Sequence, residues 1–127
     1  MKKSVSVSIL SADFLELKNE LDKIEKSNAD MLHFDVMDGV FVPNISFGFP
    51  VLDTVNKYTD IHLDVHLMIT DPLKYIDECV KFGADIITIH LESESDTEKT
   101  LDKIKVVLKY IENNYMNRIS IADIATT

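Results

Sequence analysis

Short apolar runs alternate along the chain with longer segments in which apolar residues recur every three or four positions. Runs of this length that are rich in β-branched residues predict buried strands, whereas spacings of three and four predict amphipathic helices. The strands are expected in the apolar runs at residues 4–10, 31–36, 61–69 and 84–92. The helices are expected in the periodic segments at residues 12–28, 50–58, 71–82 and 96–111.

Residues that typically begin or end helices predict the limits of the later helices. Asp71 precedes Pro72 and is expected to cap a helix that has the proline in its first turn, and Gly83 lies where that helix should end. Asp96 or Thr97 opens the last helix, which places Leu101, Ile104, Val107, Leu108 and Ile111 on one side.

Strands separated by helices of this length pair in parallel through right-handed crossovers. An open doubly wound sheet and a closed eight-unit barrel both satisfy this order. A doubly wound sheet would have a glycine-rich turn after its first strand, and the stretch "SILSADF" contains no glycine. We therefore predict an α/β fold of parallel β/α units. Because a full (β/α)8 barrel needs about 250 residues, these units are half of a TIM-type barrel.

Composition narrows the class of protein. Of the 127 residues, 46% are hydrophobic and 28% are charged, as expected for a packed globular chain. The net charge of −9 makes nucleic acid an unexpected partner. The single Cys79 cannot form an internal disulfide, and neither a signal peptide nor an apolar run of about 18 residues is evident. We expect a cytoplasmic protein with no membrane partner.

Imidazole and carboxylate side chains occur at alternate positions of two predicted strands. His33 and Asp35 share one face of the second strand, and His62, Asp64 and His66 share one face of the third. His33, Asp35 and His66 could supply three ligands to a divalent zinc, iron, manganese or cobalt ion at the carboxyl ends of the strands. Hydrogen-bonded core residues, or a solvated sheet face, would give the same pattern.

Neighbouring residues have supporting interpretations. His62 and Asp64 lie deeper on their strand, where we expect structural or ligand-supporting roles, and His90 could line the site. Asp38 could brace a loop or support a ligand, and Gly39 suits a turn that needs a positive φ. Covering a substrate and packing in the core are both open to the aromatic residues Phe41, Phe47 and Phe49.

Four longer stretches carry a specific resemblance, in the same order and with appropriate spacing. Over about residues 4–105 the chain resembles the ribulose-phosphate 3-epimerase family. The stretches are "SILSADF" (8–14), "HFDVMDGVFVPNISFG" (33–48), "LDVHLMITDP" (63–72) and "FGADIITIHLES" (82–93).

The resemblance implies a (β/α)8 barrel that interconverts D-ribulose 5-phosphate and D-xylulose 5-phosphate through a metal-stabilised enediolate. It implies that His33, Asp35 and His66 bind the metal and that Asp35 is also the catalytic proton acceptor. The substrate-binding residues that it implies are Ser8, Met37, His66 and Met68.

The resemblance also implies parts that the 127 residues do not supply. In this family the second acid is an aspartate on the seventh strand, and such barrels grip phosphate with loops after the seventh and eighth strands. We therefore expect a truncated epimerase that is inactive as a monomer, or a homo-oligomer that closes the open sheet edges. A non-catalytic fragment or interaction module, and an epimerase of a related hexulose phosphate, are the alternatives.

The last stretch departs from the epimerase pattern. Residues 1–105 are predicted to form the N-terminal half of the barrel, and residues 106–127 a divergent helical tail. The tail, "VVLKYIENNYMNRISIADIATT", resembles the start of an arabinose-regulator-type helix-turn-helix domain, without the recognition helix that would enter the major groove. An ordinary amphipathic helix that buries Leu108 and Ile111 is the other interpretation.

Overall fold

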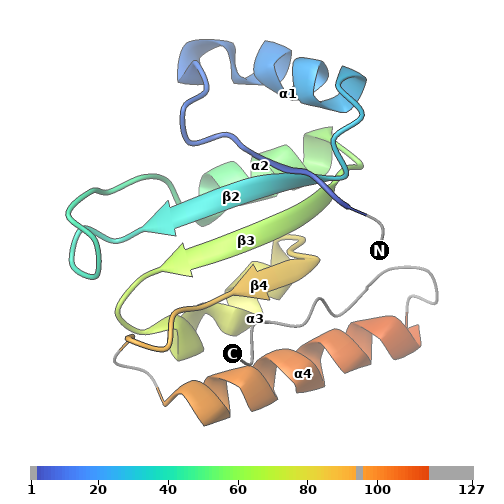
Figure 1. Ribbon diagram of the computed structural model, residues 1–127. Helices are drawn as coiled ribbons and strands as arrows, with labels where there is room; N and C mark the ends of the chain where they lie inside the picture. The colour runs from blue at the N-terminus through green and yellow to red at the C-terminus, as the bar shows by residue number, and fades with distance from the viewer. Residues whose placement is uncertain (1–2, 94–95, 115–127) are drawn as a thin grey trace.

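Four parallel strands form one sheet in the order β1-β2-β3-β4 (Figure 1). The computed structural model describes residues 3–93 and 96–114, the last eight of these as backbone only. The predicted α/β fold of parallel β/α units is confirmed. The strands are β1 (Ser6–Ser8), β2 (Met31–Met37), β3 (His62–Met68) and β4 (Ile86–Thr88).

Helices follow each strand, as the spacing of apolar residues predicts. In Figure 1, α2 and α3 lie behind the sheet, while α1 and α4 lie beyond its two edges. None of the described helices combines the length and the apolar character that crossing a bilayer requires. The helical elements are η1 (Phe14–Glu16), α1 (Leu17–Lys26), α2 (Phe49–Tyr58), η2 (Pro72–Tyr75), α3 (Ile76–Lys81) and α4 (Thr97–Asn114).

The core lies between the sheet and the helices behind it. Leu32 and Phe34 of β2 and Leu63, Val65 and Leu67 of β3 are buried on that side. Side chains alternate between the two faces of a strand, so the intervening residues of β2 and β3 project from the other face. This alternation places the histidines and aspartates of β2 and β3 on the second face of the sheet, together with methionines at the strand ends.

The central strands were predicted more closely than the edges. β2 and β3 lie within the predicted limits to about one residue, but β4 is only three residues long and ends opposite His66. The first predicted helix is divided into η1 and α1, and the Asp13 side chain caps η1 by accepting from the Leu15 amide at 3.0 Å.

The predicted limits of the later helices agree with the structure, with one exception. Asp71 precedes the first turn as predicted, but its side chain makes no capping hydrogen bond there, and the predicted helix is divided into η2 and α3. Gly83 follows the end of α3 with φ +98°, and Asp96 precedes α4, where its side chain accepts from the Lys99 amide. Helix α4 continues without a break across the predicted boundary between residues 105 and 106, which stays a prediction. The side chains of Val107, Leu108 and Ile111, and residues 115–127 of the tail, lie outside the described residues.

Candidate metal centre

Three predicted ligands meet on the polar face of the sheet, near the carboxyl ends of β2 and β3. The strand register sets Asp35 directly beside His66, and His33 two pairs earlier on β2, beside Asp64. Asp35 Oδ1 lies 3.0 Å from His33 Nε2 and 2.9 Å from His66 Nδ1, and the two nitrogens are 3.3 Å apart. The three atoms therefore form a nearly regular triangle.

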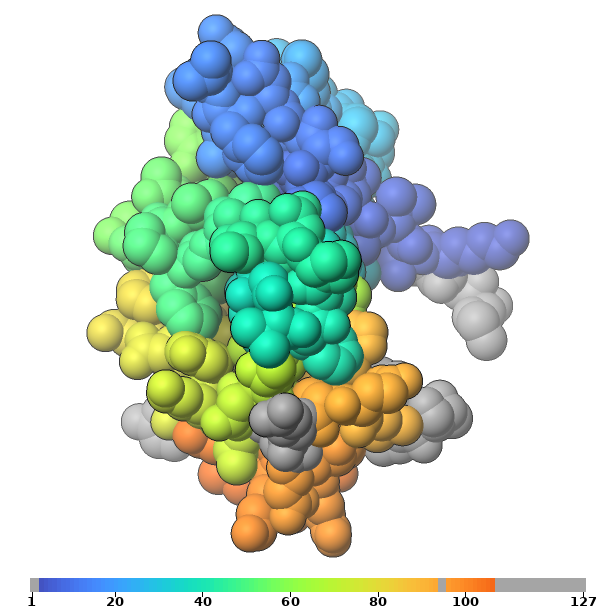
Figure 2. Space-filling view, turned by 90° about the vertical axis from the view of Figure 1, so that its left-hand side faces the viewer, coloured from blue at the N-terminus to red at the C-terminus, as the bar shows by residue number. Residues whose placement is uncertain are grey.

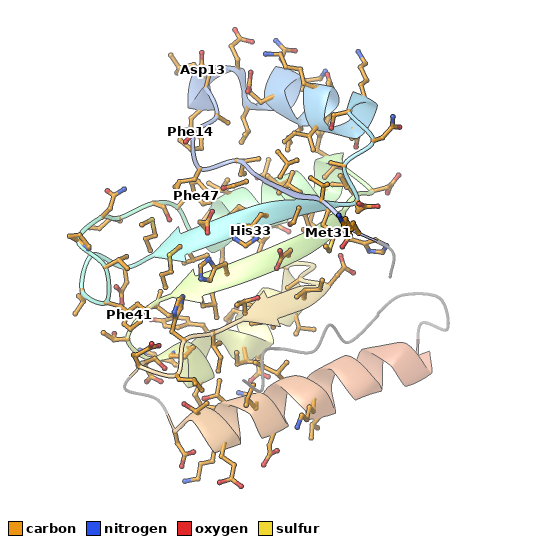
Figure 3. All side chains as sticks on the ribbon, viewed as in Figure 1. Asp13, Phe14, Met31, His33, Phe41 and Phe47 are labelled. Atoms are coloured by element: carbon orange, nitrogen blue, oxygen red, sulfur yellow. The ribbon has the colours of Figure 1, made fainter. Side chains whose placement is uncertain are left out.

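The site is sheltered but open on one side. The Asp35 side chain is 10% exposed, and the His33 and His66 side chains are 25% and 20% exposed. Figure 3 shows His33 on the β2 ribbon, and Figure 2 looks at the end of the sheet towards which β2 and β3 run. The loops after these strands gather at that end.

The donor set fits a divalent first-row cation. Two imidazole nitrogens and a carboxylate oxygen are the ligands that zinc, iron, manganese and cobalt accept. Atoms bound about 2.0–2.2 Å from one such ion stand roughly 3 Å apart, as these three do.

A carboxylate on the neighbouring strand orients His33. Asp64 Oδ2 lies 2.7 Å from His33 Nδ1 and also accepts a hydrogen bond of 2.9 Å from the Ser6 hydroxyl. The Asp64 hydrogen bond raises the pKa of His33, against the opposing effect of burial. Burial tends to raise the pKa of Asp64, but the hydrogen bonds from His33 and Ser6 outweigh it and lower that pKa. The carboxylate therefore fixes the ring with Nε2 facing Asp35.

The other two donors also have partners beyond the triangle. The Ser8 hydroxyl donates to Asp35 Oδ2 at 2.6 Å, which places the predicted substrate-binding serine against the predicted proton acceptor. His66 Nε2 lies 2.6 Å from His90 Nε2. Each donor residue is thus held through an atom that does not face the triangle.

The loop after β2 is braced by Asp38, which favours the loop-bracing interpretation of this residue. Asp38 Oδ1 accepts from the amides of Val40 and Phe41, and Oδ2 accepts from the amide and hydroxyl of Thr70. Burial acts to raise the pKa of Asp38, yet these hydrogen bonds lower it to about 2. Gly39, with φ +74°, supplies the predicted turn.

The predicted methionines and phenylalanines divide between the site and the core. Met37 and Met68 are paired in the register at the ends of β2 and β3. The Phe41 ring lies 5.2 Å from the His90 ring. Phe47 and Phe49 instead pack against the hydrophobic core, as the core-packing interpretation requires.

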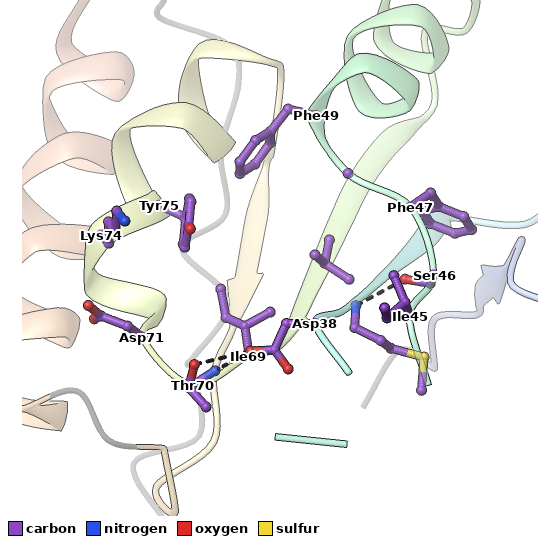
Figure 4. Close-up of a pocket in the computed structure, with 13 residues that line it drawn as sticks. Asp38, Ile45, Ser46, Phe47, Phe49, Ile69, Thr70, Asp71, Lys74 and Tyr75 are labelled. Atoms are coloured by element: carbon purple, nitrogen blue, oxygen red, sulfur yellow. Dashed lines mark hydrogen bonds between the residues drawn. The ribbon is translucent and has the colours of Figure 1, made fainter. Parts of the chain in front are cut away.

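A pocket of about 540 Å³ lies beside the metal centre and is distinct from it (Figure 4). Met37, Asp38 and Thr70 line it, together with Phe49 and Tyr75. Among the described residues, none of the three donors lines it. The pocket and the donor triangle are therefore separate features of the described structure.

Sequence reasoning missed Ser6 and did not foresee how His90 is placed. Ser6 lies two residues before Ser8 on β1, so the same alternation that pairs His33 with Asp35 could have found it. His62, in contrast, lies apart from the centre, with its side chain 57% exposed and 3.5 Å from Asp85. This placement agrees with a structural role for His62.

Comparison with known proteins agrees with the geometry. The model of the ribulose-phosphate 3 epimerase family matches residues 4–110. Ribulose-phosphate 3-epimerase of Bacillus subtilis is 50% identical over 101 residues, covering 80% of this chain and 46% of that protein. The protein of the same name from Synechocystis is 46% identical over 103 residues, covering 80% of this chain and 45% of that protein.

A third relative comes from a plant. Ribulose-phosphate 3-epimerase, cytoplasmic isoform, of Oryza sativa is 42% identical over 97 residues, covering 76% of this chain and 42% of that protein. The chain spans about half the length of the curated relatives it matches.

Proposed function

The chain belongs to the ribulose-phosphate 3-epimerase family, and from this premise we propose that it supplies the cation-binding and proton-accepting half of an epimerase site. The proposed reaction converts D-ribulose 5-phosphate to its 3-epimer, D-xylulose 5-phosphate. The observation that carries this proposal is the triangle of His33 Nε2, Asp35 Oδ1 and His66 Nδ1, with sides of 2.9–3.3 Å.

In the proposed mechanism, His33, Asp35 and His66 hold a divalent cation. When bound, this cation would polarise the ketone of the substrate and stabilise the negative charge that develops on its oxygen. Metal analysis of the purified protein would identify the bound ion as zinc, iron, manganese or cobalt.

Asp35 is the proposed proton acceptor. Its Oδ1 faces the two imidazoles, so its Oδ2 is the atom that can take the proton from C3 of the sugar. Ser8 holds Oδ2 by a hydrogen bond of 2.6 Å and could turn its hydroxyl towards the substrate instead. Met37 and Met68 are proposed to flank the reacting carbons, where thioethers exclude water without donating a proton.

Epimerisation also needs an acid on the opposite face of the sugar. In the part of the chain that the structure describes, β1 and β4 each pair on one side only. We propose that a second copy supplies further strands along these edges, completing a barrel around the site. We further propose a cytoplasmic location for this protein; the rice relative is named as a cytoplasmic isoform.

Metal analysis tests the cation site. We expect the purified chain to bind about one divalent cation, and His33→Ala and His66→Ala each to lose it. His62→Ala is the matched control, because this third histidine lies apart from the triangle. Binding that survives both substitutions would contradict the proposed site.

Turnover tests the reaction. We expect epimerisation of ribulose 5-phosphate only by an assembly larger than one chain, abolished by Asp35→Asn, with the mass in solution measured alongside. Preferential turnover of a hexulose phosphate would show that the proposed pentulose substrate is wrong. A metal-free monomer without activity would favour a non-catalytic interaction module.

A further inference from the structure

His90 lies next to the proposed ligand His66 but takes no part in the proposed chemistry. It follows the end of β4, and its Nε2 lies 2.6 Å from Nε2 of His66. The two rings are stacked, with centroids 4.9 Å apart and planes inclined by 29°. The Phe41 ring also contacts His90, at 5.2 Å, so the orientation of this side chain is fixed by two neighbours.

Two ring nitrogens this close share one hydrogen, so one of them donates and the other accepts. His66 faces the donor triangle with Nδ1. A cation bound at Nδ1 uses the lone pair of that atom, and a neutral imidazole then carries its hydrogen on Nε2. With a cation bound, Nε2 of His66 is therefore the donor and Nε2 of His90 the acceptor.

A carboxylate lies on the other side of the His90 ring. When Nε2 of His90 accepts, its Nδ1 carries the hydrogen, and this atom lies 3.9 Å from the Glu92 carboxylate, beyond hydrogen-bond distance. Each of the two proposed histidine ligands thus faces the triangle with one ring nitrogen and has a partner at the other nitrogen. His33 faces the triangle with Nε2 and is held at Nδ1 by Asp64, whereas His66 faces it with Nδ1 and is held at Nε2 by His90.

We propose that His90 is a positioning residue that acts through His66. By accepting the hydrogen bond of Nε2–H, it selects the tautomer and the ring orientation that leave Nδ1 of His66 free to bind a cation. This inference rests on the proposed function, because it takes His66 as a metal ligand.

Two substitutions separate hydrogen bonding from stacking. His90→Phe keeps an aromatic ring beside His66 and removes the acceptor. His90→Gln removes the ring and keeps an acceptor oxygen. His62→Gln is the matched control, because His62 is exposed and does not contact the donor triangle.

The first measurement is titration of the full 127-residue chain with Co²⁺, followed by visible absorption. We expect His90→Phe to weaken Co²⁺ binding about 10-fold or more and to alter the d–d bands, because the ligand loses its partner. We expect His90→Gln to restore binding to within about 3-fold of wild type, and His62→Gln to change nothing. A purely structural role for the ring would give the opposite order for the two His90 variants.

The second measurement needs no variant and therefore stands even if His90→Phe does not fold. Long-range ¹H–¹⁵N correlation of the zinc-loaded protein should show His66 bound through Nδ1 with hydrogen on Nε2. Binding through Nε2, or wild-type Co²⁺ affinity and spectrum in His90→Phe, would overturn the inference about His90 alone. A wild-type chain that binds no Co²⁺ would overturn the proposed function together with it.

Discussion

Carboxylates fix the geometry of this protein at the scale of single residues. Asp64 sets the orientation of His33, and Asp38 joins the loop after β2 to Thr70. Both carboxyl groups have lowered pKa values because they accept several hydrogen bonds. Each can be neutralised with little change in shape, so an Asp→Asn substitution isolates the role of its charge.

Asp64→Asn should weaken binding of a divalent cation about 10-fold, because His33 loses the anion that orients its ring and increases its basicity. Isothermal titration with Zn²⁺ measures this effect. Asp53→Asn is the control, since within the described part of the chain Asp53 pairs only with Lys57, on the surface of α2. An equal loss in both variants would mean that the effect is one of general charge.

Asp38→Asn should lower the free energy of unfolding at pH 7 by about 1–2 kcal/mol, because an amide cannot accept all four hydrogen bonds. The pKa of Asp38 is about 2 when folded, below its ordinary value of about 3.9. The unfolded chain therefore takes up this proton first as the pH falls. The charge of Asp38 stabilises the fold above about pH 4, and this contribution is lost between about pH 4 and pH 2.

Urea denaturation at a series of pH values checks this prediction. The difference in stability between wild type and Asp38→Asn should narrow as the pH falls from about 4 towards 2. A difference that stays constant over this range would show that the lowered pKa does not contribute.

The residues of the donor triangle could be predicted from the alternation along β2 and β3, but their ring orientations could not. Alternation places His33 and Asp35 on one face of β2, and His66 on one face of β3, without reference to the rest of the fold. The nitrogen that each ring turns to the triangle also has to be matched to partners elsewhere, Asp64 on β3 for His33 and His90 after β4 for His66. Only the register of the assembled sheet brings those partners into contact.

At the scale of elements, the loop after β2 connects the candidate site to the helical layer. Its turn at Gly39 has φ +74°, a conformation that L side chains rarely adopt. A Cβ atom added there would lie 2.6 Å from Cγ1 of Ile45, so the loop has space for glycine only.

Gly39→Ala should therefore destabilise the protein by about 1–2 kcal/mol or more, from the backbone conformation together with the clash. Chemical denaturation measures the loss. Gly48→Ala is the matched control, because nothing lies within 4 Å of a Cβ atom there and its φ is −133°. Equal costs at the two positions would contradict this account of the turn.

The limits of elements were predictable where burial is continuous and less so at the edges. β2 and β3 are paired on both sides, and their apolar residues at alternate positions define their length. The run at 84–92 is also rich in apolar residues, but among the described strands β4 pairs with β3 alone and ends after three residues. An apolar run indicates that a segment is buried, whereas a strand also needs a hydrogen-bonding neighbour along its length.

At the scale of the whole molecule, the sheet is strongest at its centre. β2 and β3 are joined over seven residue pairs, while β1 and β4 are each attached over three. Helices α2 and α3 cover one face of the sheet (Figure 1), and strand alternation places the donor triangle on the other face, where Figure 3 shows His33. Stability should therefore decrease from the middle of the sheet towards its edges.

Hydrogen exchange should be slowest for the amides of β2 and β3 and faster for those of β1 and β4, because the outer strands have partners on one side only. Exchange followed by mass spectrometry at several protein concentrations measures this. Protection of β1 and β4 that rises with concentration would support pairing with a second copy. Uniform protection at high dilution would contradict the expected gradient.

Binding of the proposed cation would be thermodynamically linked to folding, because the seven-pair register between β2 and β3 aligns its ligands. A slip of one residue would turn the β2 donors to the opposite face of the sheet. An ion that needs all three donors would therefore stabilise only one register of β2 against β3. By mass action, a free cation concentration 100 times its Kd would add about 2.7 kcal/mol to the native state. The melting temperature of this protein would then rise with the free cation concentration in its surroundings.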